Sequence, residues 1–178
     1  MDITNNNFLF KNELNQWAKV YAEKKLVDDE ITNQWLVFYL GKEKFALSMD
    51  YVDELALLEY GIALYNVRPE IVGMINLRGN AVLLLDMRKI IKTRDDPKKN
   101  YKNKKDKKVI ILRDSKNQRT GFLVDSIDGI VQLPAGTFNT YSLAENDQQA
   151  VYVGSVAEYE GNGISKINVE SLLKIIEA

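Results

Sequence analysis

Residues 71–88 read IVGMINLRGNAVLLLDMR, and this stretch decides the fold class. Its two apolar runs, 71–79 and 80–85, meet at Gly79-Asn80, a dipeptide that predicts a tight turn with positive φ. The next residue, Asp86, is of the type that caps helices, so we expect a short helix over 87–91. The stretch therefore predicts a strand, a turn, a second strand and a capped helix.

Further strand pairs surround this unit, because β-rich runs alternate with turn residues along most of the chain. We predict them over residues 35–40 with 43–48, 108–114 with 119–125, and 151–160 with 163–168. Residues 50–55 are expected to form a short helical turn capped by Asp50. Asn168 is expected to cap a closing helix over 169–176.

The second half of the chain repeats the plan of the first. Gly79-Asn80, an apolar strand, Asp86 and a helix recur 82 residues later as Gly161-Asn162, an apolar strand, Asn168 and a helix. Many short strands at regular spacing favour barrels or sandwiches, and the repeat favours two small barrels side by side. The predicted order is an N-terminal helical extension, a first barrel, a basic loop, a second barrel and the closing helix, over about 1–33, 34–91, 92–107, 108–168 and 169–176.

Composition excludes much of enzyme chemistry. The chain has no histidine and no cysteine, which removes the imidazole base, the thiol nucleophile, the zinc thiolate site and the phosphohistidine. The carboxylates Asp50, Asp53 and Glu54 resemble an acid–base pair or a hard-metal site, but they lack a glycine-pinned ligand loop. We therefore expect no catalytic residue, no cofactor and no metal, and a solvated acidic face instead.

Charge is unevenly distributed along the chain. Residues 92–108 contain nine lysines and arginines against three aspartates, a net charge of +6, while the rest carries −7. Such a run can attract nucleic acid, and a nucleic-acid-binding barrel using this loop is the alternative function. A solvated loop is the preferred interpretation, because Tyr101 is its only aromatic residue. No targeting signal or long apolar run is evident, which favours a cytoplasmic protein without membrane insertion.

The strand-and-turn motif Asn76-Leu77-Arg78-Gly79, with Gly73 before it and Asp86-x-Arg88 after it, resembles the signature of the CheW family of bacterial chemotaxis coupling proteins. The similarity covers about residues 34–176 and includes the opening hairpin and the segment TGFLVDSIDGIVQLP at 120–134. It implies a mostly β fold of two five-stranded, SH3-like barrels with short helices, an N-terminal helix and a C-terminal helix. The leading helix, with Leu14, Trp17 and Tyr21 on one face, resembles the PilI-like branch that serves twitching motility.

The resemblance implies a non-catalytic adaptor with two protein partners. These are the regulatory domain of a CheA-type histidine kinase and the cytoplasmic tip of methyl-accepting chemoreceptors. The expected location is the cytoplasm, at receptor arrays near the inner membrane. Neither nucleic acid nor direct membrane insertion belongs to this role.

Arg78 is the leading candidate for a partner contact, because a guanidinium between a strand and a turn can form directed bonds to a partner carboxylate. The alternative is an internal ion pair with Asp86 or Asp53. Asn76, Leu77 and Gly79 complete the expected partner-binding motif. Val52 and Leu55 are candidates for a receptor groove, although apolar residues at this spacing also suit a core.

Overall fold

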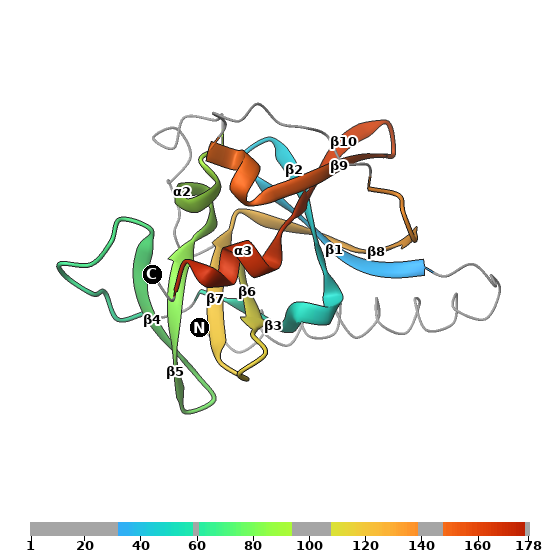
Figure 1. The fold of residues 1–178 in the computed structure, drawn as a ribbon. Helices are drawn as coiled ribbons and strands as arrows, with labels where there is room; N and C mark the ends of the chain where they lie inside the picture. The colour runs from blue at the N-terminus through green and yellow to red at the C-terminus, as the bar shows by residue number, and fades with distance from the viewer. Residues whose placement is uncertain (1–31, 59–60, 94–107, 139–147, 177–178) are drawn as a thin grey trace, which may run out of the picture.

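Ten strands form two five-stranded sheets in the computed structural model, which describes residues 32–58, 61–93, 108–138 and 148–176 (Figure 1). The first sheet has the order β8-β1-β2-β10-β9 and the second has the order β3-β6-β7-β5-β4. The strands are β1 (Thr32–Leu40), β2 (Glu43–Ser48), β3 (Val52–Leu57), β4 (Ile71–Leu77), β5 (Asn80–Asp86), β6 (Lys108–Arg113), β7 (Arg119–Val124), β8 (Ser126–Pro134), β9 (Val153–Tyr159) and β10 (Asn162–Ile167). The short helices are η1 (Met49–Tyr51), α2 (Met87–Ile91), η3 (Gln148–Val151) and α3 (Val169–Lys174).

The mostly β class with two five-stranded sheets is confirmed, but the sequential division into barrels is wrong. The first sheet takes two strands from the start of the chain and three from its end, and the second sheet takes the five strands between them. Parallel pairing of β2 with β10 and of β5 with β7 joins these distant segments. The boundaries 34–91 and 108–168 therefore do not separate the sheets, because a local sequence repeat carries no information about long-range pairing.

The segment after the first hairpin also differs from expectation. Ser48, not Asp50, caps the short helix η1: its hydroxyl accepts a hydrogen bond from the Asp50 amide. The residues that follow form β3, which pairs with β6. A single helical turn thus follows β2 of the first sheet, and the chain enters the second sheet at Val52.

The expected hairpins and the two later helix caps are confirmed. The Asp86 carboxylate accepts a hydrogen bond from the Arg88 amide at 3.1 Å, and the Asn168 side chain accepts one from Ser171 at 3.1 Å. The expected N-terminal helix and most of the expected basic loop lie outside the described residues. Only residues 92, 93 and 108 of the basic run 92–108 belong to the described part.

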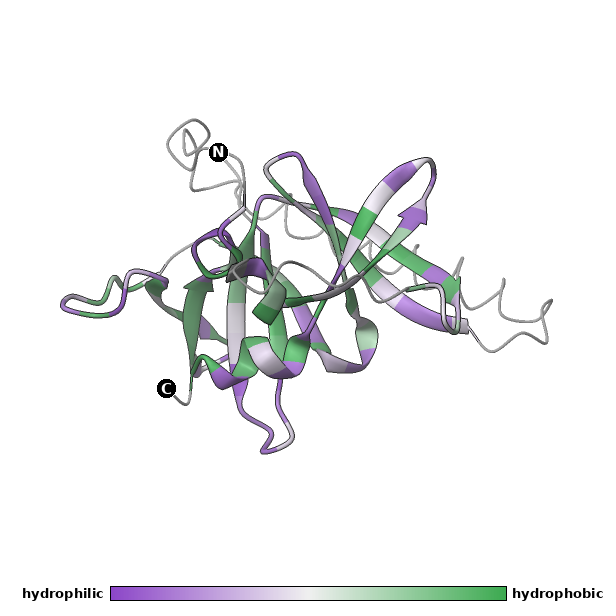
Figure 2. Ribbon diagram, turned by 45° about the horizontal axis from the view of Figure 1, so that its top comes forward, coloured by the Kyte–Doolittle hydropathy of each residue, from purple (hydrophilic) through white to green (hydrophobic). Residues whose placement is uncertain are grey.

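β1 in the first sheet and β6 and β7 in the second are buried on two faces along most of their length, which explains their nearly continuous apolar sequences. In β1, Leu36, Phe38 and Leu40 belong to a large cluster shared by the two sheets, while Trp35 and Val37 pack in a cluster of the first sheet alone. The second sheet repeats this alternation along β6 and has its own smaller cluster. Figure 2 shows the hydrophobic residues concentrated along the strands and hydrophilic residues at the hairpin ends.

An ion pair joins the two sheets where the chain passes from one to the other. Asp125 lies between β7 and β8, and its carboxylate accepts hydrogen bonds from the Arg88 Nε at 2.6 Å and from the Gly41 amide at 2.6 Å. Arg88 belongs to α2 after the second sheet's β5, and only 5 % of its surface is exposed. Gly41 belongs to the β1–β2 turn of the first sheet.

Loss of this carboxylate should destabilise the protein strongly. Asp125→Ala should lower the free energy of unfolding by about 3–5 kcal/mol, because the buried Arg88 guanidinium loses the anion with which it pairs. The double variant Arg88→Met with Asp125→Ala should lose less free energy of unfolding than Asp125→Ala alone. Urea unfolding measures both values.

Glu158→Ala is the matched control, since it removes an exposed carboxylate from β9 with the same change in charge. Its effect should stay within about 0.5 kcal/mol. Equal losses for Asp125→Ala and Glu158→Ala would show that the ion pair does not hold the sheets.

Candidate functional site

The Arg78 hairpin protrudes from one end of the second sheet. Leu77 pairs with Asn80, so the connecting loop consists of Arg78 and Gly79, with φ values of 52° and 85°. Positive φ at both positions is the pattern of a type I′ turn, which matches the twist of paired strands. The Asn76 side chain accepts a hydrogen bond from the Gly79 amide at 2.8 Å and braces the turn. The turn thus lies one residue earlier than the predicted Gly79-Asn80.

Arg78 occupies a backbone conformation that an arginine adopts only at a cost. The left-handed region disfavours side chains with a Cβ by roughly 1–2 kcal/mol, and asparagine or glycine is the usual choice at this place in the turn. The Arg78 side chain is nevertheless 69 % exposed. A strained and exposed residue at a hairpin tip is typical of a position retained for function rather than for stability.

The internal partner of Arg78 is Glu54, at 2.9 Å from the Arg78 Nη2. The two partners expected from sequence are engaged elsewhere: Asp86 caps α2, and Asp53 pairs with Arg113 and Arg119. Since β3 and β4 are the edge strands of the second sheet, the Arg78–Glu54 pair links the two edges of this sheet. The internal pairing and a partner role are compatible, because an exposed ion pair contributes only about 0–1 kcal/mol.

The other predicted site residues separate into surface and interior positions. Asn76 and Gly79 are exposed beside Arg78, whereas Leu77 is 9 % exposed and belongs to the cluster of the second sheet. Val52 and Leu55 lie on β3 and pack, half-buried, against the cluster that both sheets share. Of these predicted residues, Asn76, Arg78 and Gly79 therefore form an exposed polar surface, with the half-buried Glu54 beside it.

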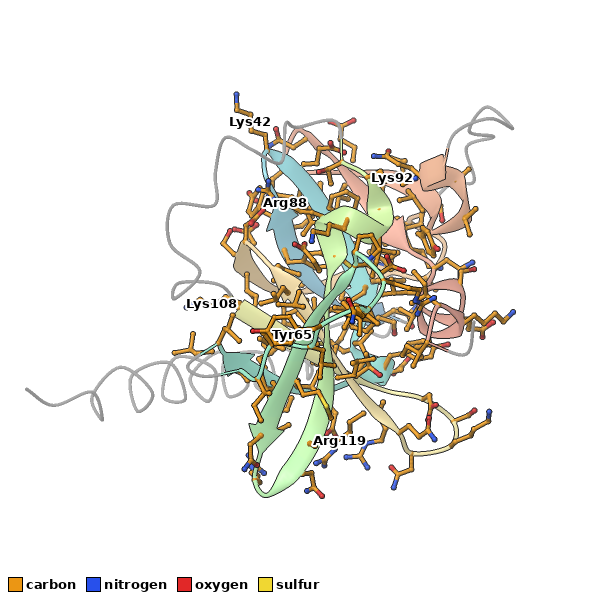
Figure 3. All side chains as sticks on the ribbon, turned by 90° about the vertical axis from the view of Figure 1, so that its left-hand side faces the viewer. Lys42, Tyr65, Arg88, Lys92, Lys108 and Arg119 are labelled. Carbon is orange, nitrogen blue, oxygen red and sulfur yellow. The ribbon has the colours of Figure 1, made fainter. Side chains whose placement is uncertain are left out.

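A second exposed feature, which sequence patterning missed, is the loop over residues 61–70 before β4. Ile62 and Tyr65 are 74 % and 87 % exposed, and Tyr65 lies on the side of the molecule that faces the viewer in Figure 3. Ile62 exchanges two backbone hydrogen bonds with Met74, at 2.8 and 2.9 Å. A Cβ on Gly73 would lie 2.2 Å from the Ile62 oxygen, so this close approach requires glycine. Three of the four large hydrophobic side chains that are exposed in the described residues belong to this loop, which makes it a candidate protein contact surface.

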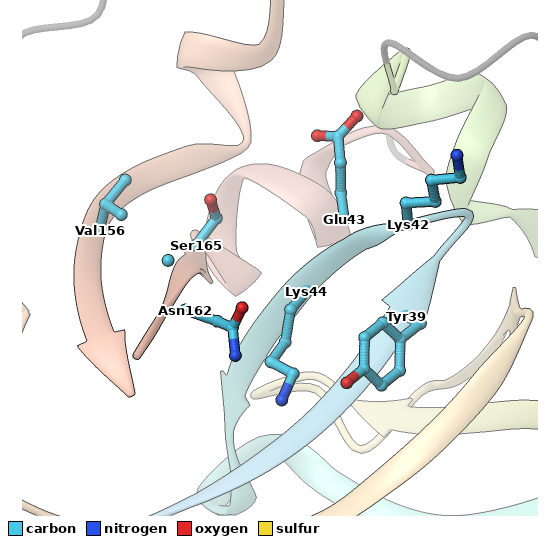
Figure 4. A pocket seen from close by; sticks show the side chains of 8 residues that line it. Tyr39, Lys42, Glu43, Lys44, Val156, Asn162 and Ser165 are labelled. Atoms are coloured by element: carbon cyan, nitrogen blue, oxygen red, sulfur yellow. The ribbon is translucent and has the colours of Figure 1, made fainter. Parts of the chain in front are cut away.

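A polar cavity of about 310 Å³ lies in the first sheet, between the β1–β2 and β9–β10 hairpins (Figure 4). The Lys44 ammonium within it lies 3.0 Å from Asp128. A hydrogen bond with Tyr39 raises the pKa of Lys44 above its ordinary value of 10.5; Asp128 acts in the same direction and burial opposes both. Because charges of both signs line the cavity and its ammonium is already paired, it does not favour one class of ligand.

The described ranges contain no group of three or more His, Cys, Asp or Glu residues that could hold a metal ion. Among the helices in these ranges, none has the length and apolar character needed to cross a membrane. The basic run 92–108 lies mostly outside them, so its alternative role in nucleic-acid binding stays a prediction.

Arg78→Asn tests whether the arginine serves stability. Asparagine followed by Gly79 is a favoured pair for this turn, so relief of the backbone cost should offset the lost ion pair. We expect the free energy of unfolding to be unchanged or raised by up to about 1 kcal/mol, as measured by urea denaturation. A loss of more than about 1 kcal/mol would instead assign Arg78 a structural role.

Comparison with known proteins agrees with this architecture. The model of the CheW-like domain family matches residues 34–177. Among solved structures, the scaffolding protein TtCheW from Thermoanaerobacter tengcongensis superposes with a TM-score of 0.66 at 21 % sequence identity, covering 78 % of this chain and 90 % of that one. A search of curated proteins gives no significant sequence match. Since the family model spans most of the chain, the protein belongs to the CheW-like domain family.

Proposed function

We propose that this protein is a non-catalytic adaptor that couples chemoreceptors to a CheA-type histidine kinase in a bacterial chemosensory array. Family membership supports this role, as does the similarity in fold to a scaffolding protein. The absence of histidine and cysteine from the sequence agrees with a protein that binds partners rather than carrying out chemistry. The array would place it in the cytoplasm near the inner membrane, serving chemotaxis or, in the PilI-like branch, twitching motility.

The kinase contact centres on Arg78. The observation that carries this proposal is the exposed, strained arginine at the hairpin tip, with Asn76 and Gly79 exposed beside it. A guanidinium forms charge-assisted hydrogen bonds with carboxylates and carbonyl oxygens, and such bonds are roughly twice as strong as neutral ones. The regulatory domain of the kinase docks on this end of the second sheet.

The receptor contact uses the apolar side of β3. Val52 and Leu55 keep part of their surface exposed while packing against the shared cluster. An apolar strip on a rigid strand suits the apolar face of a helical hairpin tip. Leu77 contributes indirectly, by anchoring the Arg78 turn to the interior of the second sheet.

Calorimetric titration with the regulatory domain of a CheA-type kinase from the same genome tests the function. We expect binding in the micromolar range, since the end of a small sheet offers limited contact area. Arg78→Asn, which preserves the turn, should weaken binding about tenfold or more, and Arg78→Glu should abolish it. Glu158→Ala, on β9 of the first sheet and outside this contact, is the control and should bind like the wild type.

Thermal melting of each variant must accompany the titration. Absence of wild-type binding to every such kinase in the genome would overturn the proposed role. Undiminished binding by Arg78→Glu would leave the role in place but move the kinase contact to another surface.

A further inference from the structure

A β-bulge at the start of β3 brings two consecutive carboxylates to one end of the second sheet. Val52 pairs with Leu112 and Glu54 pairs with the next residue, Ile111, so Asp53 is the extra residue. In a regular strand, neighbouring side chains point to opposite faces, but a bulge disrupts this alternation. Here Asp53 and Glu54 both pair with arginines from the hairpins at the same end of the sheet.

Three arginines converge on these two carboxylates. Arg78 binds Glu54, while Asp53 accepts a hydrogen bond from Arg113 Nη2 and lies 2.8 Å from Arg119 Nε. Arg113 and Arg119 are direct neighbours across the β6–β7 pair, an arrangement of like charges that is unfavourable without a shared anion. The β4–β5 and β6–β7 hairpin tips lie side by side at the bottom of the view in Figure 1, and Arg119 lies at the same end in Figure 3.

The positive groups of this cluster are more exposed than the negative ones. The side chains of Asp53 and Glu54 are 14 % and 20 % exposed, against 30 % to 69 % for Arg119, Arg113 and Arg78. The cluster therefore carries a net charge of +1, with its guanidinium groups outermost. The opposite charges of Asp114 and Lys116, on the β6–β7 hairpin, cancel each other. A guanidinium has several N–H donors, so one ion pair does not exhaust its capacity.

We propose that Arg113 and Arg119 extend the Arg78 contact into one arginine face, whose partner is an acidic surface of the kinase regulatory domain. This inference rests on the proposed function and identifies the chemistry of the partner's side of the contact: aspartate or glutamate side chains. The planar fork of a guanidinium matches a carboxylate in two directed bonds. A nucleic acid suits this face less well, because two carboxylates lie beneath the arginines and the excess charge is small.

Salt-dependent calorimetry of the full chain with the kinase regulatory domain tests this proposal. Between about 0.1 M and 1 M salt the Debye length falls from about 10 Å to about 3 Å, so wild-type affinity should fall at least about fivefold. Arg119→Gln should weaken binding about three- to tenfold at the lower salt and flatten the salt dependence. Arg119→Lys, which keeps the charge but not the planar fork, should have an affinity between those of the wild type and Arg119→Gln.

Lys42→Gln is the matched control, since it removes one positive charge at the far end of the molecule from Arg119 (Figure 3). Its affinity should stay within about twofold of the wild type. A purely structural role for the cluster predicts a lower melting temperature for Arg119→Gln with an unchanged salt dependence. If Arg119→Gln does not fold, Arg119→Lys supplies the test of this residue, and a wild-type affinity that is independent of salt still overturns the proposal.

The outcomes separate this inference from the proposed function. Wild-type binding that is insensitive to salt and to Arg119→Gln overturns the acidic partner surface and leaves the adaptor role standing. No wild-type binding overturns both. Tighter binding of a DNA or RNA oligonucleotide than of the kinase domain, lost in Arg119→Gln, overturns the inference in favour of a nucleic-acid surface.

Discussion

The relative placement of the two sheets depends on one carboxylate, that of Asp125. It binds the side chain of Arg88, which follows β5 of the second sheet, and the backbone amide of Gly41, in a turn of the first sheet. The Asp125 amide also donates to the carbonyl oxygen of Tyr39. Apolar burial drives the sheets together, but it is non-directional and tolerates sliding. The ion pair is directional, and its dissociation would separate a buried guanidinium from this carboxylate, so it fixes the register of one sheet against the other.

Local features could be predicted from the sequence because local chemistry decides them. The hairpins and the caps at Asp86 and Asn168 depend on residues within a few positions of one another. The interleaving of the sheets depends on parallel pairs such as Leu83 with Thr120, between segments far apart in the chain. Hydrophobic patterning cannot choose among such pairings, because strands such as β5 and β7 bury apolar residues on both faces and offer no single face that selects a neighbour. The expected sequential barrels were wrong for this reason.

The candidate site likewise combines a local feature that the sequence predicts with a long-range pairing that it does not. Arg78 and its turn are evident from the sequence, because Asn-Leu-Arg-Gly between apolar runs marks a strand end. Its partner Glu54 was not predicted: Asp53 and Asp86 were equally plausible anions, and a bulge leaves no pattern in the sequence. The bulge decides the outcome, since it assigns Asp53 to the β6–β7 arginines and leaves Glu54 to Arg78. The arginine cluster therefore emerges only when the register of β3 is known.

Burial distinguishes the ion pairs that hold the fold from those that can exchange partners. Arg88 is almost completely buried, so separation of its ion pair costs several kcal/mol, and no partner protein can compete for Asp125 cheaply. Arg78 is mostly exposed, and its pair with Glu54 contributes at most about 1 kcal/mol. An incoming carboxylate can thus replace Glu54 with little loss of stability, while the left-handed backbone keeps the guanidinium at the tip. A weak internal pair holds the arginine in position without preventing it from binding elsewhere, whereas the buried pair, at the opposite end of β5, holds the two sheets together.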